Sequence, residues 1–186
     1  MLLLQSELQF SRLSNVRASK TSPFDVVLGL RLASESGTLV QLADELAVVP
    51  SQIHASLRRL ATAGLLRPNS RATNSRALVE FVIHGIRYAF PAAKGPLTAG
   101  VPTAYSAPPL SAEIDAIDVV VWPAQLHPAA VQGFSVAPLY PAAPQLLDRS
   151  PATYELVALA DALRLGDPRT RIIARERLEQ RLGARA

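Results

Sequence analysis

The chain has 186 residues, of which 49% are apolar and 18% charged, with a formal net charge of +4 at pH 7. This composition excludes a disordered chain and predicts one domain or two small ones. The sequence has no cysteine, which excludes disulfides, thiolate nucleophiles and zinc sites built on cysteine.

Membrane and export signals are not expected. The apolar start at residues 1–4 lacks a basic region and meets charges too early for a signal peptide. The longest candidate span, residues 114–138, is broken by acids and prolines. We therefore expect a cytoplasmic protein that has no contact with a membrane.

The charges are unevenly distributed. Residues 1–94 carry eleven Lys or Arg against six Asp or Glu, whereas residues 111–148 carry four acids and no base. A basic front and an acidic middle favour a protein that presents one end to a polyanion. Ordinary solvated surface explains the charge equally well, so the interpretation depends on the predicted elements.

Three consecutive helices are predicted between residues 22 and 64. Each begins at a residue type that commonly caps helices, and glycines end the first and the third. The predicted ranges are 22–37, 38–46 and 51–64, with N-caps at Ser22, Thr38 and Ser51 and terminal glycines at Gly37 and Gly64.

The second and third of these helices have the pattern of a helix-turn-helix. Both are amphipathic, and Ala43 provides a small residue where they cross. The apolar stripe of the third helix faces inward, which leaves the opposite face for the major groove of duplex DNA. That face and its flank carry Ser51, Gln52, His54, Arg58 and Arg59.

The chemistry of this face suits DNA. Gln reads adenine, Arg reads guanine or binds phosphate, and the N–H groups that begin a helix also suit a phosphate. Arg58 and Arg59 have a simpler alternative, because arginines late in a helix are favoured by its dipole. Their place on the outer face of the second helix of the motif favours DNA contact.

The segments LVQLADEL (39–46) and VPSQIHASLRRLATAGLL (49–66) resemble the helix-turn-helix of MarR-type and related winged-helix regulators. The resemblance covers about residues 24–68 and implies a DNA-binding transcription regulator. In that family a wing hairpin follows, but residues 69–76 are polar and do not alternate. The wing is therefore either short and basic, with Arg67, Arg71 and Arg76, or absent.

The middle of the chain predicts short strands. A helix over 76–84, capped by Asn74 or Ser75, is expected to stop at Gly85. Residues 87–91 mix bases and aromatics, as nucleic-acid surfaces do, but an edge strand is the favoured interpretation. Residues 95–151 hold ten of the fifteen prolines, with β-prone runs at 117–122 and 134–140.

The C-terminal part predicts a helical hairpin, with helices over 155–165 and 169–182. Three roles are open for its apolar stripe: it closes the protein's own core, it binds a partner protein, or it forms a dimer contact. Closure of the core is the favoured interpretation. Four arginines of the second helix are expected to face outward: Arg171, Arg175, Arg177 and Arg181.

No constellation for catalysis is present. His54, His84 and His127 have no carboxylate or second histidine at a metal-ligand spacing. The chain lacks a Gly-x-Ser-x-Gly elbow and a glycine-rich phosphate loop. We therefore expect no enzyme, no metal and no cofactor.

Together these features predict an α+β protein with two parts. Residues 1–94 form a winged helix-turn-helix domain, and residues 95–186 form a Pro-rich, short-stranded region with a C-terminal helical hairpin. We expect a homodimeric regulator that binds double-stranded DNA and represses its own operon. The layout is similar to that of abortive-infection antitoxin regulators, so the alternative is an antitoxin that neutralises a toxin protein by direct contact, with DNA binding secondary.

Overall fold

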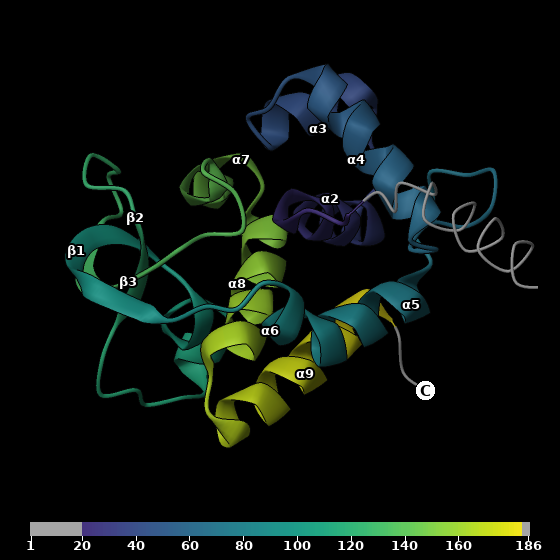
Figure 1. Cartoon of the computed structure of the whole chain (residues 1–186). Helices are drawn as coiled ribbons and strands as arrows, with labels where there is room; N and C mark the ends of the chain where they lie inside the picture. Colours follow the sequence, from purple (N-terminus) through teal and green to yellow (C-terminus); the bar gives the residue numbers. More distant parts are fainter. Residues whose placement is uncertain (1–19, 184–186) are drawn as a thin grey trace, which may run out of the picture.

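The computed structural model describes residues 20–183, and it combines α-helices with a small β-sheet (Figure 1). This confirms the α+β prediction. The predicted features of the N-terminus, residues 1–4, lie outside the described residues. No helix within residues 20–183 is long and apolar enough to cross a membrane.

Three helices open the described chain, as predicted: α2 (Pro23–Ser34), α3 (Leu39–Glu45) and α4 (Pro50–Thr62). Thr38 is the N-cap of α3, where its hydroxyl accepts a hydrogen bond from Gln41 N at 3.2 Å. Gly64 follows Ala63, the C-cap of α4, and adopts a φ of +72°, a conformation that suits glycine. The expected end of α2 at Gly37 is wrong, because the helix ends at Ser34.

The start of α4 differs from the prediction. Val49 is the N-cap, and Ser51 lies inside the first turn. Pro50 explains the difference, because proline suits the first helical position, where a backbone N–H needs no partner. The side chain of Gln52 takes over part of the capping, since its Oε1 accepts from Val49 N at 3.2 Å.

The turn between α3 and α4 contains a strained residue. Ala47 has a φ of +50°, in the left-handed region that disfavours residues with a Cβ. Its N–H donates to Asp44 O, and Val48 N donates to Ala43 O, so the turn is held by backbone hydrogen bonds. Backbone bonding therefore maintains a conformation that alanine does not favour by itself.

Replacement of Ala47 by glycine is expected to stabilise the protein. Glycine adopts this φ without strain, and the net gain in the free energy of unfolding is about 1 kcal/mol after the entropic cost of glycine. Ala61→Gly, at an exposed position of α4, serves as the control and should cost about 0.5–1 kcal/mol. Urea unfolding measures both, and destabilisation by Ala47→Gly would contradict the strain.

A short hairpin and a long helix follow α4. Leu66 and Thr73 form an antiparallel β-bridge. The helix that follows consists of α5 (Ser75–Glu80), a π-helical turn at Phe81–Gly85, and α6 (Ile86–Ala89). Its cap is Asn74, one of the two expected residues, with Ala77 N donating to Asn74 Oδ1 at 3.3 Å.

Two predictions for this region are wrong. The helix does not stop at Gly85 but passes through the π-turn to Ala89. The expected edge strand at residues 87–91 is absent, and residues 86–89 are helical instead. Tertiary packing explains both outcomes, because Ile86 is fully buried and α6 packs on α8, which extends the helix past the glycine.

The sheet within the described residues has three strands: β1 (Lys94–Pro102), β2 (Val120–Pro123) and β3 (Val131–Val136). β1 pairs antiparallel with both others, and β2 pairs parallel with β3, so the strands close on themselves. The two predicted β-prone runs supply β2 and β3 with shifted ends, whereas β1 was not predicted. A Cβ at Gly100 would overlap the carbonyl oxygen of Trp122, so only glycine allows β1 and β2 to approach there.

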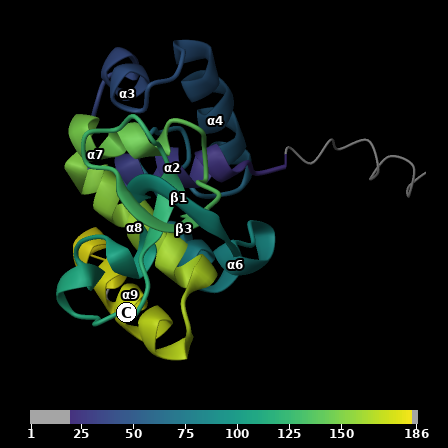
Figure 2. The ribbon, with the colours of Figure 1, turned by 90° about the vertical axis from the view of Figure 1, so that its left-hand side faces the viewer.

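The C-terminal hairpin is confirmed as α8 (Pro151–Leu165) and α9 (Pro168–Leu182), preceded by α7 (Leu146–Arg149). Short 3₁₀ turns lie at Ala104–Ser106, Leu110–Ala112 and Ala143–Gln145. Most of α8 is buried, and it packs against α2, α6, α7 and α9. Figures 1 and 2 show α3 and α4 together at one end of the molecule and α9 at the other.

One hydrophobic cluster runs through the described part of the chain. It includes Val26 of α2, Leu60 of α4, Trp122 of β2, Leu159 of α8 and Leu178 of α9, all fully buried. Leu156, Leu159 and Leu163, which supply the apolar stripe expected for the first helix of the hairpin, all lie in this cluster. The hairpin therefore contributes to the protein's own core, and this core extends across the predicted domain boundary at residue 94.

A buried carboxylate lies at the centre of this core. Asp161 of α8 has no exposed surface and accepts hydrogen bonds from Trp122 Nε1 at 2.6 Å and Thr103 Oγ1 at 3.0 Å. Arg164 pairs with its other oxygen at 2.5 Å and donates to Phe90 O at 2.7 Å. Burial raises the pKa of Asp161, and Arg164 and the two hydrogen bonds counteract that effect.

Removal of one donor to Asp161 should destabilise the fold. Thr103→Val keeps the shape but leaves the carboxylate short of a partner, which should lower the free energy of unfolding by about 1.5–3 kcal/mol. Thr98→Val is the control, because the Thr98 hydroxyl makes only a 3.5 Å contact to Ala99 O; its effect should stay within ~0.5 kcal/mol. Equal effects in denaturant titrations would contradict a structural role for the Asp161 network.

Candidate nucleic-acid interface

The exposed surface of α4 carries four of the five residues predicted there. Ser51, His54 and Arg58 lie on the side of α4 away from the buried Ile53 and Leu60, and Gln52 is exposed in the first turn of the helix. Three of them lie along one line of the helix, because residues 51, 54 and 58 are separated by three and four positions. The amide nitrogen of Gln52 has no protein partner within the described residues, while its oxygen accepts from Val49 N.

Arg59 is not on this open face, which corrects the prediction. Its guanidinium forms a two-pronged pair with Asp25 of α2, with Nη2–Oδ1 at 2.6 Å and Nε–Oδ2 at 2.8 Å. Asp25 is fully buried, and Ser56 Oγ donates to it at 2.6 Å. The helix rotation that buries Ser56 also turns Arg59 toward α2, so Arg59 fixes α4 on α2.

The charge state of Asp25 follows from these contacts. Burial by itself raises the pKa of this carboxyl, but hydrogen bonds from Arg59, Ser56 and Ser22 N outweigh burial and hold the pKa below its ordinary value. Asp25 therefore stays ionised at neutral pH. Sequence reasoning missed Asp25 and Ser56, although Asp25 at the third helical position after Ser22 has the spacing of a capping box.

Replacement of Arg59 by alanine is expected to destabilise the protein by about 2–3 kcal/mol, because it leaves the buried Asp25 charge without its partner. Arg59 keeps 25% of its side chain exposed, which places the cost at the lower end for buried pairs. Arg58→Ala is the control and should change the free energy of unfolding by at most ~0.5 kcal/mol.

The cost of Arg59→Ala should depend on pH. Since the folded-state pKa of Asp25 is lowered, its contribution is complete above the unfolded pKa of about 4 and is lost as pH falls through the folded value. The difference between wild type and variant is therefore largest at neutral pH and shrinks in acid. Urea titrations at several pH values measure it, and a pH-independent difference would contradict the ion pair.

The hairpin after α4 brings two further predicted residues to the surface. Arg67 N donates to Ala72 O at 2.8 Å and Asn74 N donates to Leu65 O at 2.9 Å, which closes a tight loop around Asn69. Asn69 has a φ of +53°, a conformation that asparagine tolerates well. Arg67 and Arg71 are exposed on this loop, and Arg76 is exposed on the first turn of α5.

The exposed arginines of α4, the hairpin after it and α5 differ from most other arginines of the described chain in that they form no ion pair. Within residues 20–183, no carboxylate pairs with Arg58, Arg67, Arg71 or Arg76. Seven arginines elsewhere in that range form ion pairs: Arg31, Arg59, Arg149, Arg164, Arg175, Arg177 and Arg181.

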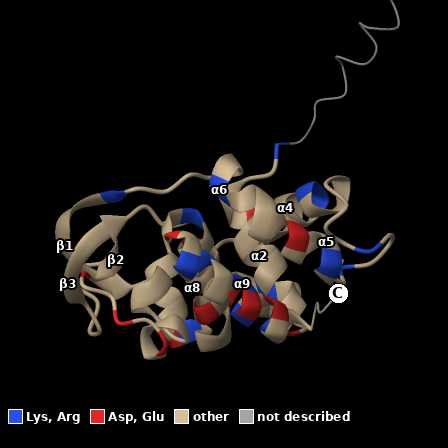
Figure 3. Ribbon diagram, turned by 90° about the horizontal axis from the view of Figure 1, so that it is seen from below, with Lys and Arg blue, Asp and Glu red and all other residues tan. Residues whose placement is uncertain are grey.

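The composition of this segment explains the difference. From residue 46 to residue 79 the sequence contains five arginines and no Asp or Glu. Figure 3 shows the resulting basic segments around α4 and α5 and on the loop that joins them. We call the surface formed by these side chains the basic face: Ser51, Gln52, His54, Arg58, Arg67, Arg71 and Arg76.

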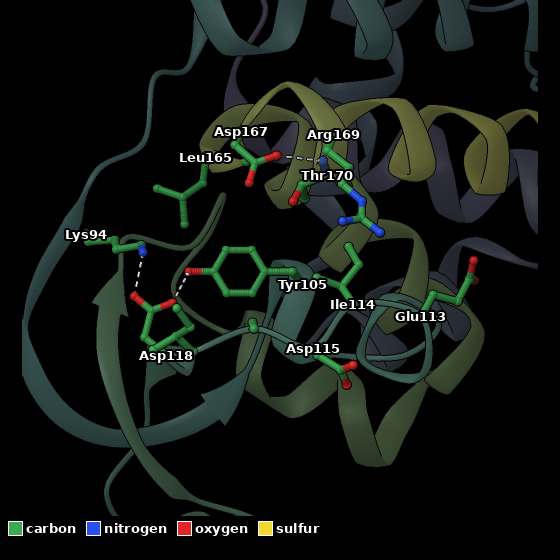
Figure 4. A pocket seen from close by; sticks show the side chains of 13 residues that line it. Lys94, Tyr105, Glu113, Ile114, Asp115, Asp118, Leu165, Asp167, Arg169 and Thr170 are labelled. Carbon is green, nitrogen blue, oxygen red and sulfur yellow. Dashed lines mark hydrogen bonds and ion pairs between the residues drawn. The ribbon is translucent and has the colours of Figure 1, made fainter.

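A cavity of about 830 Å³ lies away from the basic face, between the loop at 113–118 and the turn from α8 to α9 (Figure 4). On its wall Asp118 accepts hydrogen bonds from Lys94 Nζ at 2.5 Å and Tyr105 Oη at 2.9 Å. The bond to Asp118 raises the pKa of Lys94, and the bond from Lys94 lowers the pKa of Asp118. Both groups are therefore held charged at neutral pH, so Lys94 keeps the proton that a nucleophilic amine has to lose and the lowered pKa makes Asp118 a weaker base.

The three histidines lie apart. His54 is on α4, His84 in the π-turn, and His127 after β2, where its Nε2 lies 3.1 Å from Asp148 Oδ2. No group of three His, Asp or Glu residues within 20–183 has a geometry that holds a metal ion. The expected position of His84 at a helix C-terminus is wrong, because the helix continues to Ala89.

Comparison with known proteins found no matching family model, no matching curated protein and no matching solved structure.

Proposed function

We propose that the chain is a DNA-binding transcription regulator. Its helices α2, α3 and α4, with the hairpin closed by Leu66 and Thr73, form a winged helix-turn-helix. The observation that carries this proposal is the basic face, where four arginines without a carboxylate partner in residues 20–183 and three hydrogen-bonding side chains surround the second helix of a helix-turn-helix pattern. Duplex DNA offers a regular array of phosphates beside readable base edges, and the basic face offers partners for both.

The order of elements supports the proposal. In winged helix-turn-helix proteins the recognition helix is followed by a two-stranded hairpin, and the bridge between Leu66 and Thr73 occupies that place here. We infer that this hairpin is a minimal wing, the short and basic alternative of the two expected from the sequence. Arg67 and Arg71 at its loop then contact phosphates beside the groove that receives α4.

The residues of α4 divide into two roles. Arg58 and Gln52 carry the side chains that commonly recognise guanine and adenine edges in the major groove, and Ser51 and His54 extend the same line. Arg59 acts indirectly, because its pair with Asp25 sets how α4 lies on α2. A regulator of this kind acts as a homodimer on a repeated site, and we propose the DNA upstream of its own gene as that site.

An antitoxin that neutralises a toxin protein is the second candidate. Exposed apolar side chains on the C-terminal half favour a protein contact there, since Leu97, Ile117 and Leu126 are 66%, 106% and 100% exposed. These positions lie outside the basic face, so a protein partner and DNA are able to bind at the same time. Copurification with the product of a neighbouring gene distinguishes this candidate from a regulator alone.

The salt dependence of DNA binding tests the proposal. Phosphate neutralisation makes the logarithm of the affinity fall linearly with the logarithm of the salt concentration, with a slope of about 0.9 for each phosphate that the protein neutralises. Arg67→Ala with Arg71→Ala should therefore lower the slope by about 2 per bound protomer and weaken binding to all sequences alike. Fluorescence anisotropy with labelled upstream DNA measures the slope.

Arg58→Ala should behave differently, with a decrease of about 1–3 kcal/mol in binding free energy on the specific site and relaxed preference over a shuffled duplex. Arg169→Ala, an exposed arginine at the opposite end of the molecule, is the matched control and should leave both affinity and slope unchanged. A flat salt profile of the wild type, or equal effects of Arg58→Ala and Arg169→Ala, would refute DNA binding through the basic face.

A further inference from the structure

Two exposed apolar side chains line one groove, which lies between α9 and the segment formed by the π-turn and α6. Tyr88 is 74% exposed and Ile172 is 59% exposed, and both line the same hollow of about 330 Å³. No Asp or Glu lines it, and four basic side chains do, of which Arg175 is paired with Glu179 beside the groove: His84, Arg87, Arg171 and Arg175. We call this surface the basic groove.

The π-turn accounts for the apolar side chain on this surface. A π-turn inserts one extra residue and changes the direction in which later side chains point. Ile86 is thereby fully buried, while Arg87 and Tyr88 face outward, with the Arg87 guanidinium 4.9 Å from the centre of the Tyr88 ring. π-turns occur frequently at functional sites, and exposed apolar groups gathered in one groove mark a contact surface.

A complementary surface lies elsewhere on the same chain. The loop at residues 113–118, called the acidic loop, carries Ile117 with its whole side chain exposed. Its acids Glu113 and Asp118 pair with Arg177 and Lys94, whereas Asp115 has no partner within the described residues. The loop therefore presents an isoleucine close to a carboxylate, the reverse of the charge found in the basic groove.

The basic groove and the acidic loop flank the same turn. Gly166 and Asp167, in the turn from α8 to α9, line the cavity beside the acidic loop, and Pro168, the next residue, lines the basic groove. A two-fold axis passing near this turn would set the loop of each copy over the groove of the other. Such a contact is reciprocal and closed, as symmetric dimers require.

We propose that a second copy of this chain occupies the basic groove. Ile117 of one protomer packs between Tyr88 and Ile172 of the other, and Asp115 faces the guanidinium groups of the groove. Buried apolar anchors supply the affinity, and the opposite charges select the orientation. The inference gives a surface to the homodimer of the proposed function, and its test is carried out without DNA, so either proposal is able to fail alone.

Two substitutions test the contact from its two sides. Ile117→Glu and Ile172→Glu each place a charge in the apolar contact and should weaken dimerisation by about 30-fold or more, measured by sedimentation velocity. Leu126→Glu is the matched control, because Leu126 is also 100% exposed but lies outside both surfaces, and it should leave the dimer unchanged. Thermal unfolding of each variant confirms that the fold is retained.

Mixing the two variants provides the decisive measurement. In a dimer of either variant alone, each of the two symmetry-related contacts has one substituted side. In a mixed dimer, the groove of the Ile117→Glu protomer and the loop of the Ile172→Glu protomer form one contact without any substitution. The mixture should therefore dimerise more tightly than either variant alone. A wild type that is monomeric across the micromolar range, a dimer insensitive to both substitutions, or a mixture no tighter than its parts would overturn the proposal.

Discussion

The fold depends on a carboxylate that is buried where the helices meet the sheet. The Asp161 carboxylate accepts hydrogen bonds from Trp122 of β2, from Thr103 directly after β1, and from Arg164 of its own helix. Arg164 also donates to the backbone carbonyl of Phe90. A buried charge is costly unless each of its lone pairs is satisfied. These partners are therefore obligatory, and together they set where the sheet and the end of α6 lie on α8.

A second buried carboxylate that pairs with an arginine lies near the other end of the molecule. Asp25 is also fully buried, and it also pairs with an arginine while a hydroxyl group donates to it. The two sites differ in net effect, because the pKa of Asp25 is lowered whereas that of Asp161 is raised. At Asp25 the hydrogen bonds prevail over burial, so this pair favours the orientation of α4 on α2 at neutral pH.

Local patterns predicted the elements whose boundaries are determined by local chemistry. Thr38 and Gly64 mark helix boundaries as predicted, Asn74 is one of the two caps expected for α5, and the C-terminal hairpin follows from its apolar stripe. Gly85 and residues 87–91 were misread, because burial of Ile86 against α8 overrides a glycine and an alternating pattern. No local signal marks β1, since its partners β2 and β3 are more than fifteen residues away in sequence.

The candidate site was also predicted only in part, because local patterns reveal some of its residues and contacts between distant segments position the others. Helical periodicity placed Ser51, Gln52, His54 and Arg58 on an outward face, and turn chemistry exposed Arg67 and Arg71. Arg59 was misplaced because its partner Asp25 is 34 residues away, a contact that no periodicity reveals.

The type of cationic side chain on the basic face determines how its charge responds to pH and to modification. All of its permanently charged groups are arginines, and the whole sequence contains only two lysines, Lys20 and Lys94. A guanidinium keeps its proton at any physiological pH, and lysine acetylation cannot remove its charge. The positive charge that its four arginines give this face is thus constant across the physiological pH range.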